Sequence, residues 1–172
     1  MQQLLALIRD VPDFPRPGVI FKDITPLLAD PAGLAMAVEL MANPFRGKGV
    51  ELVVGAESRG FIFGTAVAQA LSAGFVPVRK PGKLPRPTIG VEYALEYGAD
   101  RVEIHEDAIR RGQRVLLVDD VVATGGTMHA CVQLIDRLGG VLLGASVLIE
   151  IGFLQGRQAT RLGDSLHAAL RF

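Results

Sequence analysis

The sequence predicts an α/β protein built on a mainly parallel sheet flanked by helices. Short apolar runs at Val50–Gly55, Val115–Val118 and Val141–Ile151 have the length and composition of buried strands. Helical patterns follow the first two of these runs, at Phe61–Leu71 and Thr127–Leu138. Strands that alternate with helices indicate a parallel sheet with helices on both faces.

Composition limits the function classes. A chain of 172 residues fits one domain with a sizeable core. Eighteen basic residues balance eighteen acidic ones, so the overall charge gives no reason to expect nucleic-acid binding. The sequence contains no apolar run of transmembrane length and no secretory leader pattern, and its single cysteine, Cys131, excludes an internal disulfide framework. We therefore expect a soluble cytoplasmic protein.

The N-terminal segment begins with helical spacing, which three prolines then interrupt. Pro12, Pro15 and Pro17 predict an irregular segment after the first residues. Asp30 followed by Pro31 predicts an N-cap and the first residue of a helix, which should run to about residue 43.

The middle of the chain predicts a strand and then a long functional loop. The strand is expected at Phe75–Arg79, where a proline argues against a central, fully paired position. Prolines and glycines interrupt residues 80–97, and a loop of this length inside a compact domain is usually functional or disordered. Weak alternation at Arg101–His105 predicts the return strand of a hairpin. The tail should add a short helix from Gly156 and a strand near residues 166–170.

The most informative segment is Val115–Thr127, in which two acids and a Thr-Gly-Gly-Thr turn follow an apolar strand. Carboxylates such as those of Asp119 and Asp120 suit ribose hydroxyls or a metal ion. A glycine-rich loop at a helix N-terminus suits a phosphate. A Walker A loop is excluded because Met128 stands where its lysine would be, and the Rossmann glycine spacing is absent. The segment therefore predicts a ribose phosphate site.

A second loop, Glu57–Gly60, follows another predicted strand. Ligands of parallel α/β sheets bind at the carboxyl ends of the strands. We therefore expect this loop and the acid-containing segment to face one cleft.

These motifs resemble the type I phosphoribosyltransferase family, whose hallmark is two acids followed by a Thr-Gly-Gly-Thr-like loop. The resemblance implies the type I phosphoribosyltransferase fold in a single domain covering residues 1–172, and phosphoribosyl pyrophosphate as a substrate. It implies that the acids contact the ribose hydroxyls and that the loop holds the 5′-phosphate. The residues concerned are Asp119, Asp120, Ala123, Thr124, Gly125, Gly126 and Thr127.

The same resemblance assigns the pyrophosphate contacts. The loop formed by Glu57, Ser58 and Arg59 would bind the leaving group, and it commonly contains a cis peptide, here at Glu57–Ser58. Lys80 and Lys83 would neutralise the charge that develops as pyrophosphate departs. His105 is either a further pyrophosphate contact or a structural histidine.

Two further elements resemble the adenine-specific branch of this family. The Leu95–Gly98 segment resembles part of its flexible lid, here about residues 80–105, in which Glu96 would exchange a proton with the base and Tyr97 would help to close the site. The Phe14–Pro26 segment resembles its N-terminal hood, here about residues 1–30. That resemblance implies a base contact from the Ile20 backbone, stacking on Phe21 and a less defined substrate contact from Lys22.

The implied function is purine salvage, in which the phosphoribosyl group is transferred to adenine to give AMP and pyrophosphate. Glu96, Arg59 and Tyr97 are the implied catalytic residues, and Mg²⁺ would arrive with the substrate, because the sequence offers no set of protein metal ligands. A homodimer without nucleic-acid or membrane partners is implied. One alternative is transfer to hypoxanthine, guanine or xanthine, although Glu150–Leu154 lacks the lysine that such relatives use. The other is a non-catalytic nucleotide-binding regulator of the same fold.

Overall fold

The computed structural model describes residues 2–94 and 99–172. The chain divides into two compact units, Met1–Leu40 and Met41–Phe172. The elements of the first unit, in chain order, are α1 (Gln2–Ala6), β1 (Arg9–Pro12), β2 (Ile20–Asp23), α2 (Thr25–Ala29) and α3 (Pro31–Ala42), the last of which continues into the second unit.

The N-terminal unit corrects the prediction of an irregular segment. β1 and β2 pair in antiparallel register, from Arg9 opposite Asp23 to Pro12 opposite Ile20. Proline is tolerated here because Pro12 ends its strand, while the next two prolines lie in the connecting turn. The predicted N-cap is confirmed, since the side chain of Asp30 accepts a hydrogen bond of 2.6 Å from the amide of Gly33.

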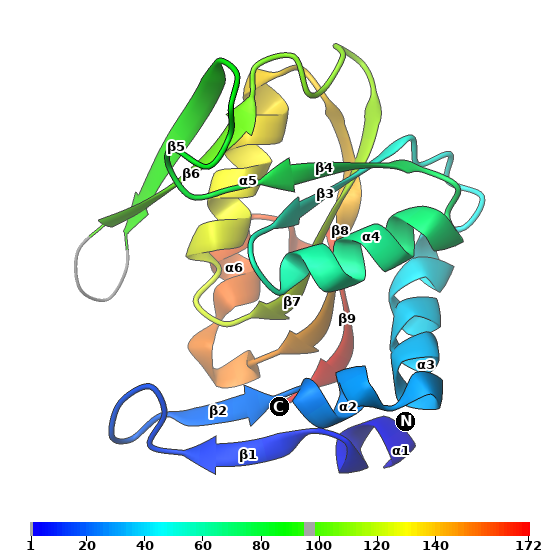
Figure 1. Cartoon of the computed structure of the whole chain (residues 1–172), viewed down its shortest axis with the longest axis vertical. Helices are drawn as coiled ribbons and strands as arrows, with labels where there is room; N and C mark the ends of the chain where they lie inside the picture. The colour runs from blue at the N-terminus through cyan, green and yellow to red at the C-terminus, as the bar shows by residue number, and fades with distance from the viewer. Residues whose placement is uncertain (1, 95–98) are drawn as a thin grey trace. The chain divides into compact units, whose positions relative to one another are not determined.

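The second unit is built on a five-stranded parallel sheet, which confirms the predicted fold class (Figure 1). Its strand order is β4-β3-β7-β8-β9. The proline in β4 lies at the sheet edge, as the sequence predicted. The bounds are β3 (Leu52–Ala56), β4 (Gly74–Val78), β7 (Arg114–Val122), β8 (Val141–Glu150) and β9 (Leu166–Arg171).

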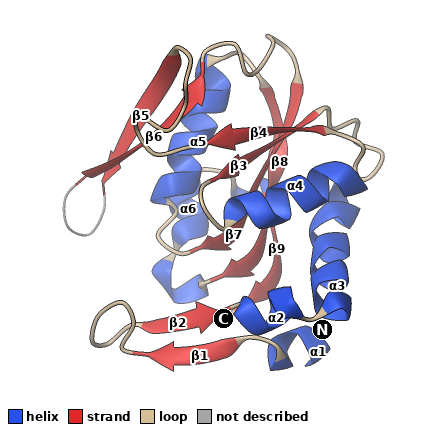
Figure 2. Ribbon diagram, viewed as in Figure 1, coloured by secondary structure: helices blue, strands red, loops and turns tan. Residues whose placement is uncertain are grey.

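Helices cover both faces of this sheet (Figure 2). Alternate residues of β7, Val115 and Leu117, share one apolar cluster with the buried side of α5. The buried residues of α4, such as Phe63, belong outside that cluster and pack on the other face. The helical elements are η1 (Asn43–Phe45), α4 (Gly60–Ala70), α5 (Gly126–Arg137), η2 (Gly152–Leu154), α6 (Gly156–Thr160) and η3 (Gly163–Ser165).

Two differences from the prediction bear on the site. β7 extends past Val118 to Val122, so the two acids lie inside the strand, because β8 continues to pair with it as far as Glu150. The predicted hairpin is confirmed as β5 (Thr88–Ala94) and β6 (Ala99–His105), which lies beside α5 (Figure 1). Within the described residues, no helix is long and apolar enough to cross a membrane.

Candidate active site

The predicted cleft is present at the carboxyl ends of β3 and β7. It has a volume of about 400 Å³, and both loops singled out in the sequence line it. The expectation that parallel strands bring these loops together is therefore confirmed. The lining residues are Glu57, Ser58, Arg59, Asp119, Asp120, Val121, Val122, Ala123, Thr124, Gly125, Gly126, Thr127 and Met128.

The glycine-rich loop leads directly into the N-terminus of α5. Gly125 precedes the helix in a left-handed conformation, with φ of 84° and ψ of −4°, which favours glycine. The helix is joined to this residue by a hydrogen bond of 2.9 Å from the amide of His129 to the carbonyl of Gly125. No side chain from the described part of the chain caps this end. The first amides of the helix therefore have no acceptor within it and can bind an anion in the cleft.

The two acids have different surroundings. Asp120 is buried and forms an ion pair with Arg59, with 2.6 Å between Nε and Oδ2. Asp119 accepts a hydrogen bond of 2.9 Å from the amide of Asp120, and its carboxylate lies against the first residue of α4, Gly60. Burial, and then the neighbouring charge of Asp120, raise the pKa of Asp119 well above its usual value. A ligand that offers hydroxyl donors or positive charge to Asp119 would relieve this cost.

The Glu57–Ser58 peptide bond is cis, which confirms the prediction made for this loop. Glu57 is fixed by an ion pair of 2.8 Å with Arg79 and by its amide, which donates to the carbonyl of Val78. Desolvation is the largest single effect on Glu57 and raises its pKa, but the hydrogen bonds from Arg79 and the Lys80 backbone, with the nearby positive charges, together lower the pKa by more. The carboxylate is therefore charged and occupied in holding the loop, which leaves Ser58 and Arg59 facing the cleft.

Lys80 is bound to the hairpin, and Tyr93 of the hairpin contacts the glycine-rich loop. Its Nζ donates to the hydroxyl of Tyr93 at 3.0 Å and forms an ion pair with Asp100. The same tyrosine hydroxyl lies 3.3 Å from Oγ1 of Thr127 and donates to Asp100 at 3.0 Å. Desolvation would lower the pKa of Lys80, but hydrogen bonds to Asp100 and Tyr93 raise it. Lys80 is therefore a stable cation, joined to the glycine-rich loop through Tyr93.

Lys83 and His105 are not among the described residues that line the cleft. Lys83 is exposed in the turn after β4, and His105 ends β6 with its Nδ1 buried and without a hydrogen-bond partner among the described residues. Glu96 and Tyr97 lie outside the described residues, so their predicted roles stay predictions.

The predicted base contacts belong to the N-terminal unit. Ile20 is exposed, Phe21 packs edge-on against Phe14 with 5.1 Å between ring centroids, and Lys22 forms an ion pair with Asp10. Their roles toward the base stay predictions.

Sequence reasoning missed three residues that support the cleft. Tyr93 and Asp100 hold Lys80, and Gly156 packs against the glycine-rich loop. The alternation of β5 and β6 could have placed the first two across the hairpin, where they are directly opposite each other. Nothing in the local sequence around Gly156 indicates its contact, because it depends on how α6 folds back.

The described residues contain no group of three or more His, Cys, Asp or Glu side chains placed to hold a metal ion. The adjacent acids Asp119 and Asp120 could supply oxygen contacts to a cation that other ligands also hold. This donor set fits a hydrated Mg²⁺.

The chain is similar to known proteins over almost its whole length. Residues 24–162 match the family model described as the phosphoribosyl transferase domain. The chain is 57% identical over 160 residues to the adenine phosphoribosyltransferase of Myxococcus xanthus, covering 93% of this chain and 86% of that protein. The crystal structure of adenine phosphoribosyltransferase from Thermoanaerobacter pseudethanolicus superposes with a TM-score of 0.95 and 45% identity, covering 99% of each chain. The crystal structure of APRTase from Giardia lamblia complexed with 9-deazaadenine superposes with a TM-score of 0.94 and 36% sequence identity, covering 99% of this chain and 97% of that one.

Proposed function

The chain belongs to the phosphoribosyltransferase family, and within it to the adenine phosphoribosyltransferases, and from this membership we propose that it performs their reaction in purine salvage. The phosphoribosyl group of phosphoribosyl pyrophosphate is transferred to adenine, and AMP and pyrophosphate are released. The observation that carries the proposal is that the acid pair, the glycine-rich loop and the Glu57–Arg59 loop line one cleft.

The glycine-rich loop, residues 123–127, is proposed to hold the 5′-phosphate and is called the phosphate loop from here on. Ala123–Thr127 offers backbone amides at the start of α5, where the helix dipole favours a dianion. The hydroxyl of Thr127, which here donates to the Tyr93 hydroxyl at 3.3 Å, would exchange that contact for one to the phosphate. A phosphate bound there would set the ribose ring over the acid pair.

The acids are proposed to bind the ribose hydroxyls. The charged form of Asp119 is costly in this buried position, and two hydroxyl donors would stabilise it. Asp120 is already paired with Arg59, so it orients that guanidinium toward the cleft while it contacts the sugar. Mg²⁺ enters with phosphoribosyl pyrophosphate and, when bound, neutralises charge on the leaving group.

The leaving group is proposed to contact the Glu57–Arg59 loop together with the basic residues that follow β4. Arg59 and the amide of Ser58 face the cleft, and Lys80 supplies a cation held by Tyr93 and Asp100. Lys83 and His105 would complete this surface when pyrophosphate is present. Positive charge placed in advance stabilises pyrophosphate as it departs.

The reaction itself needs little covalent chemistry from the protein. The bond from the anomeric carbon to pyrophosphate oxygen breaks, an oxocarbenium-like sugar develops, and N9 of adenine forms the new bond and loses its proton. We propose that Glu96 exchanges this proton and that Tyr97 helps the lid to close over the site. Closing excludes water, which would otherwise attack the sugar cation, so positioning and charge stabilisation carry the rate.

Adenine is proposed as the base because the features that select it are present in the sequence. The Ile20 backbone and the Phe21 ring would read and stack on the purine, with Lys22 beside them. The Glu150–Leu154 segment supplies no lysine for an exocyclic oxygen, which argues against hypoxanthine, guanine and xanthine. We also propose a cytoplasmic homodimer that binds no nucleic acid, in keeping with the balanced charge.

The deciding experiment offers each purine base with phosphoribosyl pyrophosphate and Mg²⁺ and measures pyrophosphate release. Turnover with adenine alone is expected. Turnover with an oxopurine instead would support the first alternative, and tight AMP binding without any turnover would support a regulator. A monomeric mass in solution scattering would contradict the homodimer.

A further inference from the structure

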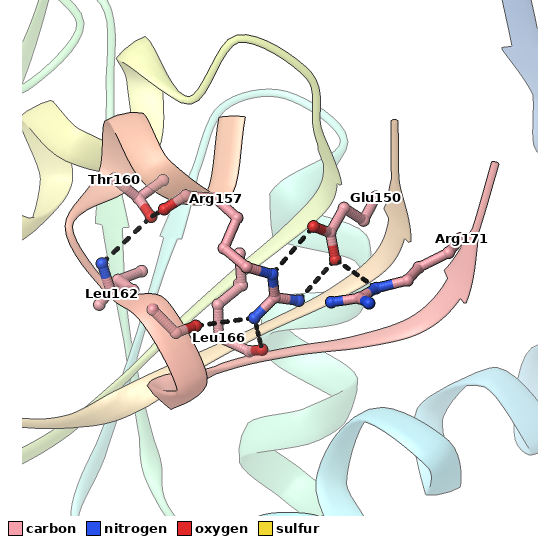
Figure 3. Close-up of polar contacts among 7 residues, drawn as sticks. Glu150, Arg157, Thr160, Leu162, Leu166 and Arg171 are labelled. Carbon is pink, nitrogen blue, oxygen red and sulfur yellow. Dashed lines mark hydrogen bonds and ion pairs between the residues drawn. The ribbon is translucent and has the colours of Figure 1, made fainter. Parts of the chain in front are cut away.

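An ionic cluster around the buried carboxylate of Glu150 lies at the carboxyl end of β8 (Figure 3). Glu150, the last residue of β8, is 6% exposed. Arg157 binds its carboxylate with two parallel hydrogen bonds, of 2.9 Å from Nε and 2.5 Å from Nη2. Arg171 adds a third, of 2.8 Å from Nε. Two guanidinium groups therefore share one carboxylate.

The two arginines differ in what else they bind. The Nη1 group of Arg157 donates to the carbonyls of Gly163 and Leu166, at 2.7 and 2.6 Å (Figure 3). Its side chain is 17% exposed, whereas that of Arg171 is 64% exposed. A guanidinium held by a bidentate carboxylate and two carbonyls has one permitted position, so Arg157 fixes the start of α6 in space.

The residue before Arg157 touches the phosphate loop. A Cβ atom on Gly156 would come within 3.0 Å of the carbonyl of Ala123, and one on Gly125 would come within 3.0 Å of the carbonyl of Gly156. Backbone therefore lies directly on backbone at this contact. The position of Gly156 decides where Ala123 and Gly125 can be, and so where the amides at the start of α5 point.

We propose that Arg157, anchored by Glu150, is a positioning residue for the 5′-phosphate subsite, acting through the contact of Gly156 with the phosphate loop. This inference rests on the proposed function, which places the 5′-phosphate in that loop. Arg157 touches no substrate. It holds the loop at the spacing in which its amides converge on the phosphate.

The chemistry of the cluster suits positioning better than stabilisation. A buried ion pair is often no more stabilising than apolar side chains of the same volume, because both charges lose their hydration. The directional hydrogen bonds of Arg157 nevertheless restrict the positions that the backbone of α6 and its neighbouring carbonyls can take. The hydrogen bond from Arg157, which outweighs the effect of desolvation, lowers the pKa of Glu150, so the carboxylate remains charged at neutral pH.

The test compares AMP with adenosine, which lacks the 5′-phosphate, by calorimetric titration of the full chain. Arg157→Met is expected to raise the Kd of AMP about tenfold, equivalent to about 1.4 kcal/mol, with less than a twofold change for adenosine. A loss of this size corresponds to misaligning about one charge-assisted hydrogen bond. The matched control is Arg171→Met, which removes the exposed partner of the same carboxylate and should change neither Kd by more than about twofold.

Gly156→Ala provides a second variant if Arg157→Met does not fold. It keeps the ionic cluster but forces Ala123 to move, so it should weaken AMP binding selectively. Equal weakening of AMP and adenosine, or unchanged AMP binding in a folded variant, would overturn the proposal. Neither ligand needs to react, so this result does not depend on the assay that measures pyrophosphate release with each purine base. Selective loss of AMP binding in a chain that shows no turnover would support the positioning role and contradict the proposed function.

Discussion

Gly60→Ala separates the stability of α4 from the geometry of the acid pair. Gly60 is the first residue of the helix and has an ordinary negative φ, so its backbone accepts alanine. A Cβ atom there would lie 2.6 Å from Oδ1 of Asp119 and 3.4 Å from the carbonyl of Val118. The obstacle to the substitution is therefore the carboxylate that we propose binds the ribose.

The two effects of this substitution have different sizes. Alanine favours a helix over glycine by at most about 1 kcal/mol, which offsets the local crowding. The carboxylate must move by about 0.8 Å to widen the contact from 2.6 to 3.4 Å, the lower limit of ordinary van der Waals contact. A displacement of about 1 Å in a positioned group can cost about 100-fold in rate. We expect kcat/KM for phosphoribosyl pyrophosphate to fall about 100-fold, which is about 2.7 kcal/mol, and Tm to change by less than about 3 °C.

Gly64→Ala is the matched control on the same helix. Its Cβ would lie 2.6 Å from Cε2 of the partly buried Phe75 on the edge strand β4, and none of its three nearest atoms belongs to either acid. Overpacking should cost about 1–3 kcal/mol of stability while kcat/KM stays within about threefold when assayed well below Tm. Pyrophosphate release and thermal unfolding measure both quantities. Full activity in Gly60→Ala, or equal losses of activity in the two variants, would refute the role assigned to Asp119.

Two further predictions concern Asp119 and Tyr93 at the site, and a third concerns the Glu150 cluster outside the cleft. Asp119→Asn removes a carboxylate whose charged form is costly, as its raised pKa indicates. Tm of the ligand-free protein should therefore rise by about 2–4 °C while turnover falls at least about 100-fold. An unchanged Tm would argue against this cost. Tyr93→Phe removes the hydroxyl that joins Lys80 to Thr127. Steady-state kinetics of the folded variant should show a loss of about 3–10-fold in kcat/KM. Wild-type kinetics would exclude a role for this link. The pKa of Glu150 is lowered, so the carboxylate contributes to stability above pH 4.5, its ordinary pKa, and this contribution is lost as the pH falls through the lowered pKa. Tm measured from pH 6 to 3 should therefore fall less steeply in Glu150→Gln than in wild type. Parallel curves would contradict this.

The parts of the site that the sequence predicted depend on short-range patterns. The apolar run before Asp119 and the glycines after it define a strand, a loop and a helix without reference to the rest of the chain. The meeting of this loop with Glu57–Arg59 follows from one general property, that parallel strands end at the same edge of the sheet. These predictions were confirmed because each required only local residues and a fold class.

The parts that could not be predicted depend on pairings between distant or weakly patterned segments. Strands β1 and β2 have four residues each and carry prolines nearby, so their pairing leaves no periodic pattern in the sequence. β7 continues to Val122 because it stays paired with β8. The sequence does not indicate this pairing, because the two acids interrupt the apolar pattern of the strand. The link from Lys80 to Tyr93 and Asp100 required the register of the hairpin.

The phosphate loop shows why a local motif is necessary for this site but not sufficient. Gly125 has a positive φ, which by itself favours glycine, and it also faces the carbonyl of Gly156 at a distance that no Cβ would tolerate. The first requirement can be inferred from a glycine-rich turn before a helix. The second arises from α6, thirty residues later, which is held in place by Arg157 and the buried Glu150. The Thr-Gly-Gly-Thr sequence permits the loop conformation, and packing from outside the motif selects it.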